Sequence, residues 1–340
     1  MNIKTRQGSE SQILSVGAYR PKRLVPNSEI VDKIESNDEW IQQRTGIASR
    51  RFADESESLL DMACWAAEDA LKKAKLTIEN IDTVIVATIT FPFQAPSAAT
   101  AILQRLGNPK AAAFDINAAC AGFCYGLSMG HDFIKAGTSK KVLVIGAEKL
   151  TDFTNPFDRA TAFIFADGAG AVILGASDEA GIGPVEWGSD ADNRDAILMN
   201  PAWTEARNYD EQKTAAGIDW PNISQEGQKV FRWAVFSVSK AAQRALEAAG
   251  VTVDDLDVFI PHQANLRIIE TMAKDMKMPE KVLIADDIRL NGNTSAASIP
   301  LAMDALLAMH PEMHGKLALL IGYGAGLVYA GQVVKLPPKP

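Results

Sequence analysis

A cysteine placed between an expected strand and an expected helix is the first residue that could do covalent chemistry. Cys120 lies within D-I-N-A-A-C-A-G-F-C-Y-G, residues 115–126, after an apolar run and before small and apolar residues at helical spacing that end at Gly137. Free backbone N–H groups and the positive dipole end of a helix favour thiolate over thiol, so this position predicts a reactive nucleophile. Plain core packing is the alternative for a lone cysteine in an apolar run.

An internal repeat indicates where partners of Cys120 would lie. The stretch A-A-E-D-A-L-K-K-A-K-L-T-I-E-N-I-D-T-V-I-V from Ala66 aligns without a gap with A-A-Q-R-A-L-E-A-A-G-V-T-V-D-D-L-D-V-F-I-P from Ala241, a displacement of 241 − 66 = 175 residues. Carried forward, this displacement puts Cys120 over Ser295. One further residue puts V-L-V-I-G from residue 142 over A-L-L-I-G from residue 318. The chain is therefore predicted to be a duplication.

Two polar residues of the second half become the expected companions of Cys120. His262 follows an apolar strand over 258–260, and Asn293 lies in N-G-N-T-S, the turn equivalent to that of Cys120. Two pseudo-symmetric halves bring equivalent strand ends to one site, where a nucleophile needs partners that are distant in sequence. The glycine-rich run over 322–326 is either a tight hairpin or, beside a nucleophile, a source of backbone N–H groups for an oxyanion.

The elements expected around these residues alternate between helices and apolar strands. Strands are predicted over 12–18 and 82–88, and an amphipathic helix over 58–75. This alternation predicts a layered α/β fold with helices covering the sheets. We expect an N-terminal half over 1–180 with the nucleophilic cysteine and a C-terminal half over 226–340 with the histidine and asparagine. The segment 181–225, rich in Asp, Asn, Pro and Trp, is predicted to connect them and shape the pocket.

Composition narrows the function classes. A hydrophobic content of 47% and a charged content of 22% are typical of a soluble globular protein. The net charge of −8 argues against a nucleic-acid binder. Three cysteines do not make a disulfide framework, and the start has no secretory signal, so we expect a cytoplasmic protein that does not enter a membrane. Zinc-ligand spacing is absent from the sequence, and no metal is expected.

Five motifs together resemble one enzyme family, 3-oxoacyl-(acyl-carrier-protein) synthase III. They are D-E-W-I-Q-Q-R-T-G-I (38–47), D-I-N-A-A-C-A-G-F (115–123), D-R-A-T-A-F-I-F-A-D-G-A-G (158–170), P-H-Q-A-N-L-R-I-I (261–269) and N-G-N-T-S-A-A-S-I-P (291–300). The resemblance spans nearly the whole chain. It implies a duplicated thiolase-like fold with α-β-α-β-α layers, a homodimer, and the condensation that starts type II fatty acid synthesis. Acyl-CoA and a malonyl acyl carrier protein would be the substrates, and no cofactor is implied.

The resemblance also implies roles for individual residues. Cys120 would take the acyl group, the backbone N–H groups of Cys120 and Ala325 would hold the oxyanion, and His262 and Asn293 would donate to the enolate of the malonyl unit. Trp40 and Arg159 resemble the pair that sandwiches the CoA adenine, with Arg44 toward the phosphates. A basic rim for the acidic carrier protein would consist of Arg232, Arg267 and Lys274.

Two departures from the family pattern concern the acyl group. Members that prefer acetyl groups carry Phe before P-S-A-A at the dimer interface, where this chain has Ala95. Ala325 interrupts the more usual run of three glycines. Both predict a branched or longer primer. The alternatives left open are a starter enzyme of polyketide synthesis with the same Cys-His-Asn set, a thioester hydrolase, and a non-catalytic carrier-binding protein.

Overall fold

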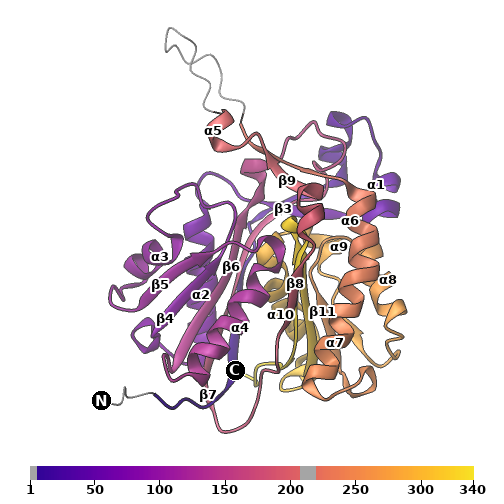
Figure 1. The fold of residues 1–340 in the computed structure, drawn as a ribbon. Helices are drawn as coiled ribbons and strands as arrows, with labels where there is room; N and C mark the ends of the chain where they lie inside the picture. Colours follow the sequence, from indigo (N-terminus) through magenta and orange to yellow (C-terminus); the bar gives the residue numbers. More distant parts are fainter. Residues whose placement is uncertain (1–5, 207–219) are drawn as a thin grey trace.

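Two five-stranded sheets frame the protein in a computed structural model that describes residues 6–206 and 220–340 (Figure 1). The first sheet contains β1 (Glu10–Tyr19), β4 (Thr83–Ala87), β5 (Ala112–Ile116), β6 (Lys141–Lys149) and β7 (Asp167–Ser177). The second contains β8 (Glu186–Ser189), β11 (Val258–Pro261), β12 (Leu283–Ile284), β13 (Leu317–Gly324) and β14 (Val328–Lys335). The predicted strands at 12–18, 82–88 and 258–260 are therefore confirmed.

The two sheets share one topology. Their strand orders are β5-β4-β6-β7-β1 and β12-β11-β13-β14-β8. In each sheet the first three strands of this order are parallel and the last two are antiparallel to their neighbours. The predicted duplication is confirmed by this correspondence, since each strand of one sheet has a counterpart at the same place in the other.

The repeat changes register by one residue before the turns that contain Cys120 and Ser295. Helices α2 (Leu59–Ala74) and α7 (Ser239–Ala249) end 175 residues apart. The two 3-10 turns Ala119–Ala121 and Ser295–Ala297 begin 176 residues apart, and their first residues share a left-handed backbone, with φ of 45° and 49°. Cys120 therefore corresponds to Ala296, and the expected match with Ser295 is wrong by one residue.

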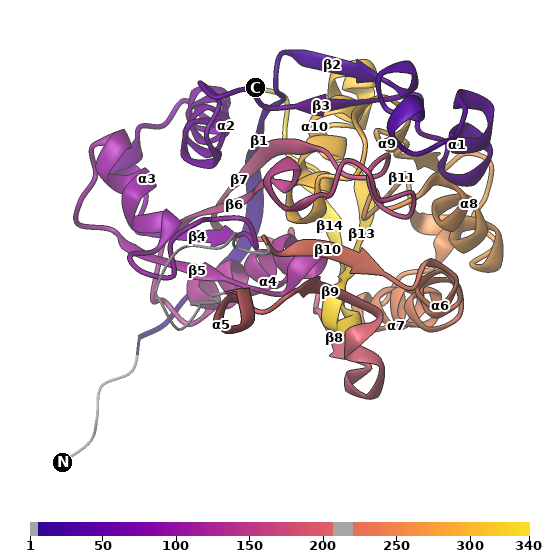
Figure 2. The same ribbon diagram turned by 90° about the horizontal axis from the view of Figure 1, so that it is seen from above.

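Helices form three layers around the two sheets. Apolar residues of α2 and α3 (Ala98–Leu106) cover the outer face of the first sheet. Between the sheets lie α4 (Gly122–Lys135) and α10 (Ser298–Met309), which pack on strands of both. The outer face of the second sheet is covered by α6 (Gly227–Trp233), α7 and α8 (Leu266–Asp275) (Figures 1 and 2). This arrangement confirms the predicted α-β-α-β-α layering, which puts the turns before α4 and α10 side by side.

Local interactions fix the helix starts near the site. Ser58 and Asp61 form a capping box at the start of α2, where the sequence predicted the helix to begin. At the end of β5, the carboxylate of Asp115 accepts from the N–H groups of Ala98 and Ala99 at 2.6 and 2.9 Å. This carboxylate ties the strand that leads to Cys120 to the first turn of α3.

Shorter elements lie outside the two five-stranded sheets. They are β2 (Arg23–Pro26), α1 (Asp38–Thr45), β3 (Ser49–Phe52), β9 (Ile197–Asn200), α5 (Trp203–Ala206), β10 (Asn222–Gln225) and α9 (Ile288–Asn291). Within the predicted connecting segment 181–225, β8 adds an edge strand to the second sheet and β9 pairs with β10. Residues 207–219 of that segment lie outside the described residues, so the boundaries 180 and 225 remain a prediction. Across 6–206 and 220–340, none of the helices combines the length and apolar character that a membrane crossing requires.

Candidate active site

One cavity brings together the residues predicted to do the chemistry. Cys120, His262, Asn293 and Ala325 all line a cavity of about 100 Å³ between the two halves. Cys120 lies in the 3-10 turn immediately before α4, and His262 follows β11 directly. Asn293 lies two residues before the matching turn of the second half. The duplication therefore placed these residues correctly, although Cys120 and Ser295 are not exact counterparts.

Burial makes the Cys120 thiol a weaker acid than its position suggested. Surrounding protein atoms raise the pKa of the Cys120 thiol to about 12, and the nearby carboxylate of Glu148 contributes to this increase. The prediction that the helix end makes the thiolate the preferred resting form is therefore wrong for the free enzyme. Hydrogen bonds from Ser295 and from the backbone N–H groups of Cys120 and Ala325 act in the opposite direction and lower the pKa.

The predicted oxyanion donors are directed at the sulfur because β13 ends very close to it. A Cβ atom added to Gly324 would lie 2.7 Å from the Cys120 nitrogen and 3.0 Å from its sulfur. Gly324 has an extended backbone, so the requirement for glycine here is one of space. Ala325 follows Gly324 and lines the cavity with Cys120, and the backbone N–H groups of both residues lower the pKa of the thiol. Two converging N–H groups are the usual means of stabilising a tetrahedral oxyanion.

His262 is held as a neutral ring in one tautomer. The ring is buried, and burial lowers the pKa of His262 to about 3. Its Nδ1 lies 2.6 Å from the hydroxyl of Ser298, which also accepts from the N–H of Gln263 at 3.3 Å. Among the described residues, Nδ1 is the only acceptor bonded to the Ser298 hydroxyl, so the hydroxyl proton is assigned to Nδ1 and the ring proton to Nε2. His262 thus offers an N–H donor without carrying charge.

Asn293 is oriented by its own turn. Its Oδ1 accepts from the N–H of Ser295 at 2.8 Å, which leaves Nδ2 as the donor on the cavity side. Its backbone also bonds to Ile164 and Ala166, with its N–H and carbonyl at 2.9 Å from their partners. An amide donor is therefore fixed beside a neutral imidazole donor, a pair suited to an oxygen that gains negative charge.

Sequence reasoning missed two residues that contact these groups. Ser298 fixes the tautomer of His262, and Glu148 accepts a hydrogen bond from Ser295 at 3.1 Å. The shifted register supplies a signal for Glu148, since a displacement of 176 makes it the counterpart of Gly324. Glu148 of the first half contacts Ser295 in the turn of the second half, and Gly324 of the second half lies against Cys120 in the turn of the first half. No comparable signal identifies Ser298, because its role depends on the position of the His262 ring.

A second cavity leads from the surface to the first. It has a volume of about 550 Å³ and shares five lining residues with the inner cavity: Ile164, Gln225, Gly227, Phe231 and Asn265. Trp40, Arg44 and Arg159 line its outer part, and both guanidinium groups lie over the Trp40 ring, at 5.3 Å for Arg44 and 5.1 Å for Arg159. The three residues predicted to hold CoA are thus adjacent, on α1 and on the loop before β7.

The predicted basic rim is only partly at this opening. Arg232 and Arg267 are exposed and line the outer cavity, and the Arg267 guanidinium lies 5.7 Å from the Phe231 ring. Lys274 is exposed on α8, two turns beyond Arg267, and lines neither cavity. Ala95 likewise lines neither cavity and lies on an exposed turn before α3. A single chain therefore does not bring Ala95 to its own site.

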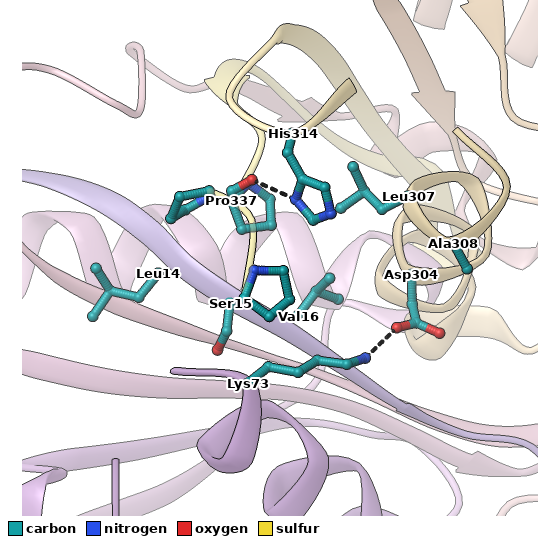
Figure 3. A pocket seen from close by; sticks show the side chains of 11 residues that line it. Leu14, Ser15, Val16, Lys73, Asp304, Leu307, Ala308, His314 and Pro337 are labelled. Atoms are coloured by element: carbon teal, nitrogen blue, oxygen red, sulfur yellow. Dashed lines mark hydrogen bonds and ion pairs between the residues drawn. The ribbon is translucent and has the colours of Figure 1, made fainter. Parts of the chain in front are cut away.

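Another hollow, of about 150 Å³, lies between β1, α2, α10 and the C-terminal segment (Figure 3). Its lining residues are not shared with the two cavities at Cys120. Lys73 pairs with Asp304 and Asp69 at 2.7 Å each, and the His314 ring donates to the carbonyl of Pro337 at 2.9 Å. Its charged groups pair with one another, and none of its lining residues is among the predicted site residues.

Comparisons with known proteins agree with this geometry. The family profile described as 3-oxoacyl-[acyl-carrier-protein (ACP)] synthase III matches residues 114–191, and its C-terminal profile matches residues 246–336. A β-ketoacyl-[acyl-carrier-protein] synthase III 1 of Streptomyces coelicolor is 51% identical over 340 residues, which cover 98% of this chain and 99% of the relative.

Two solved structures extend the agreement to the fold. The priming β-ketosynthase of the R1128 polyketide biosynthetic pathway covers 100% of both chains at 42% identity, with a TM-score of 0.96. The 3-oxoacyl-[acyl-carrier-protein] synthase III of Aquifex aeolicus VF5 has a TM-score of 0.85 at 35% identity, covering 96% of this chain and 99% of that one. The predicted thiolase-like fold is confirmed by these neighbours. Half-identical to a relative over nearly its full length, the chain belongs to the 3-oxoacyl-[acyl-carrier-protein] synthase III family of condensing acyltransferases.

Proposed function

We propose that this protein condenses an acyl-CoA primer with a malonyl acyl carrier protein, giving a 3-oxoacyl carrier protein, CoA and carbon dioxide. The observation that carries the proposal is the cavity in which Cys120 meets two N–H donors at its sulfur and two neutral donors, His262 and Asn293, opposite. The first donor pair suits acyl transfer, and the second suits an enolate.

In the first half-reaction, the Cys120 sulfur forms a bond to the thioester carbonyl of acyl-CoA. The tetrahedral oxyanion is held by the N–H groups of Cys120 and Ala325. Its collapse breaks the bond to the CoA sulfur, and the thiol proton passes to the departing CoA thiolate. Charge is thus conserved although the resting thiol has a raised pKa.

In the second half-reaction, the malonyl carboxylate leaves as carbon dioxide and its electron pair forms an enolate. The Nε2–H of His262 and the Nδ2–H of Asn293 hold the enolate oxygen. The α-carbon then attacks the acyl-Cys120 carbonyl, and the released thiolate takes a proton from solvent. Neutral donors suit this step because they stabilise the negative charge of the enolate oxygen by hydrogen bonds without protonating it.

The outer cavity suits substrates that carry a pantetheine arm. Trp40, Arg44 and Arg159 would hold the nucleotide of CoA, and Arg232, Arg267 and Lys274 would face the acidic carrier protein. No further cofactor is required by the two half-reactions, and the reaction would take place in the cytoplasm.

A homodimer completes the proposal. Within the described residues, β5 is an edge strand of the first sheet and is partly exposed, and a second copy would cover it. Such a copy would bring its Ala95 turn toward the neighbouring acyl pocket. The expected mass in light scattering is twice that of the chain, and a monomer at micromolar concentration would contradict this arrangement.

Priming of a polyketide is the second candidate, and the specific observation that favours it is the TM-score of 0.96 with the R1128 priming ketosynthase. Both functions use the same half-reactions and differ in the acyl group and the carrier protein. Turnover with a fatty acid carrier protein and a polyketide carrier protein, each loaded with malonate, separates the two.

A stepwise labelling experiment tests the condensing function. The protein is incubated with acyl-CoA alone, the acylated peptide is identified by mass spectrometry, and malonyl carrier protein is then added. Acyl label on Cys120 followed by a 3-oxoacyl product supports the proposal. If Cys120 carries no acyl label, its role as nucleophile is refuted. If the acyl group is released as free acid, hydrolysis is favoured. Cys124→Ser is the matched control, since this buried thiol lies one helical turn away and should not be needed.

A further inference from the structure

We propose that Glu148 and Ser295 form a positioning pair that sets the reactivity of Cys120, because the Glu148 carboxylate and the Cys120 sulfur compete for the single hydroxyl proton of Ser295. The inference rests on the proposed role of Cys120 as nucleophile and adds two residues to the site. Neither Glu148 nor Ser295 reacts with a substrate in this scheme. They act through the sulfur.

The surroundings of Glu148 consist of hydrogen-bond donors. Its side chain is fully buried at the end of β6. Oε2 accepts from the hydroxyls of Thr88 at 3.2 Å and Thr90 at 2.6 Å, and from the N–H of Ile89 at 3.1 Å. Both threonine oxygens accept backbone N–H groups themselves, at 3.2 Å from Thr90 and 2.9 Å from Lys149. Their protons therefore point to Glu148, and the site is built for an acceptor.

The remaining carboxylate oxygen reaches into the active site. Oε1 of Glu148 accepts from the Ser295 hydroxyl at 3.1 Å. In the structure this hydroxyl is bonded to Glu148, and it lies in the same cavity as the Cys120 sulfur, where its presence as a donor lowers the pKa of the thiol. A serine has one proton to donate, so donation to the carboxylate and donation to a thiolate exclude each other. Ser295 also holds Asn293 through its backbone N–H, a contact that does not depend on the hydroxyl.

The two partners act on the sulfur with opposite sign. A negative charge on Glu148 disfavours a thiolate nearby, whereas a donated hydrogen bond from Ser295 favours it. Burial raises the pKa of Glu148 to about 7, so its charge changes within the working pH range. Two other titratable groups line the cavity around the sulfur. Burial lowers the pKa of His262 to about 3 and raises that of Tyr323 well above its usual range, so neither changes charge between pH 6 and 9.

Two substitutions separate the effects of carboxylate and hydroxyl. In Glu148→Gln, the amide oxygen can keep the three donors at the Oε2 position, and the amide NH₂ donates to Ser295, which turns the serine proton toward the sulfur. In Ser295→Ala, only the hydroxyl is lost. Alanine is tolerated at this left-handed position, since Ala119 occupies the equivalent position of the first half with φ of 45°. Asp167→Asn is the matched control, because Asp167 is a buried carboxylate bonded to Thr151 and Ala53.

The measurement is the pH profile of Cys120 alkylation by iodoacetamide between pH 6 and 9, followed by mass spectrometry of the Cys120 peptide. We expect Glu148→Gln to be alkylated roughly three- to tenfold faster than the wild type at pH 8, since a lower thiol pKa increases the thiolate fraction more than it reduces nucleophilicity. Ser295→Ala should be slower by a similar factor, and Asp167→Asn unchanged. Acylation by acyl-CoA should follow the same order.

The outcomes distinguish this inference from the proposed function. If both variants change the alkylation rate in the same direction, or if neither changes it, the competition for one proton is refuted while Cys120 remains the nucleophile. If acyl-CoA places no label on Cys120 in the wild type, the proposed function itself fails. Should Glu148→Gln fail to fold, the slower alkylation expected of Ser295→Ala still tests the proposal, and an unchanged rate in that variant overturns it.

Discussion

The hydroxyl of Ser298 lies 2.6 Å from Nδ1 of His262, at the first residue of α10. Since Nδ1 is the only acceptor bonded to this hydroxyl among the described residues, Ser298 donates to the ring and keeps the ring proton on Nε2. His262 is thus oriented by a helix that packs between the two sheets. The position of this helix decides which ring nitrogen is free to donate into the cavity.

Ser298→Ala should impair the second half-reaction more than the first. Without the hydroxyl, both neutral tautomers of His262 become accessible, and the enolate loses part of one hydrogen bond. We expect formation of the 3-oxoacyl product to fall about tenfold, the equivalent of about 1.4 kcal/mol for one hydrogen bond. Acylation of Cys120, measured by mass spectrometry, is the internal reference. An equal loss in both steps would refute the tautomer assignment.

Acid should destabilise the protein through His262. The folded pKa of His262 is lowered to about 3 from an ordinary value of 6.5, so between these values the unfolded chain binds a proton that the native chain does not. The stability contribution is present above pH 6.5 and is lost as the pH falls, by about 1.4 kcal/mol between pH 7.5 and 5.5. Urea unfolding of His262→Asn should show a correspondingly smaller difference between these two pH values than the wild type. Exposed His310→Asn serves as the control and should behave like the wild type.

Gly324→Ala should damage both the fold and the oxyanion site. The new Cβ would lie 2.7 Å from a backbone nitrogen of Cys120, so β13 or the catalytic turn has to move. We expect a loss of about 3 kcal/mol in unfolding free energy and no detectable acyl-enzyme. Gly227→Ala is the matched control for the unfolding free energy, because a Cβ there has nothing within 4 Å. A stable, acylated Gly324→Ala protein would contradict the close approach of β13 to Cys120.

Trp40→Ala should weaken recognition of the nucleotide without affecting the chemistry. The ring contacts two guanidinium groups, at 5.1 and 5.3 Å. We expect KM for acyl-CoA to rise roughly tenfold, in line with two partly exposed cation–π contacts. The corresponding acyl-pantetheine thioester has no nucleotide, so Trp40→Ala should react with it at the same rate as the wild type. The control is Trp187→Ala. The Trp187 ring packs on Tyr125 and does not line the outer cavity. A matching loss with acyl-pantetheine would place Trp40 elsewhere in the mechanism.

Ala95→Phe should narrow the choice of primer. If a neighbouring chain contributes this turn to the acyl pocket, the larger ring shortens the channel. The expected result is a lower ratio of isobutyryl-CoA to acetyl-CoA turnover, measured with both primers in competition. An unchanged ratio would show that the channel argument is wrong.

The sequence predicted the two-sheet frame and the meeting of Cys120, His262 and Asn293 in one cavity because duplication leaves a periodic trace. Cys120 follows β5 and His262 follows β11, while Asn293 lies just before the turn that matches the turn of Cys120. The one-residue shift was not predicted, because the gapless match of 66–86 with 241–261 aligns the strands but not the turns that follow them. The acidity of Cys120 could not be predicted either, since it depends on desolvation by residues distant in sequence and on the charge of Glu148.

The exchange of contacts between Glu148 and Gly324 across the two halves has an evolutionary consequence. Each of these residues ends the equivalent strand of its own half and contacts the catalytic turn of the other. In a symmetric pair of identical chains, both turns would have to be alike. A single duplicated chain is free of that constraint, and its two turns differ. Under the proposed mechanism, one turn carries the acyl group and the other stabilises the enolate, so the asymmetry of the two steps belongs to the whole chain and to neither half alone.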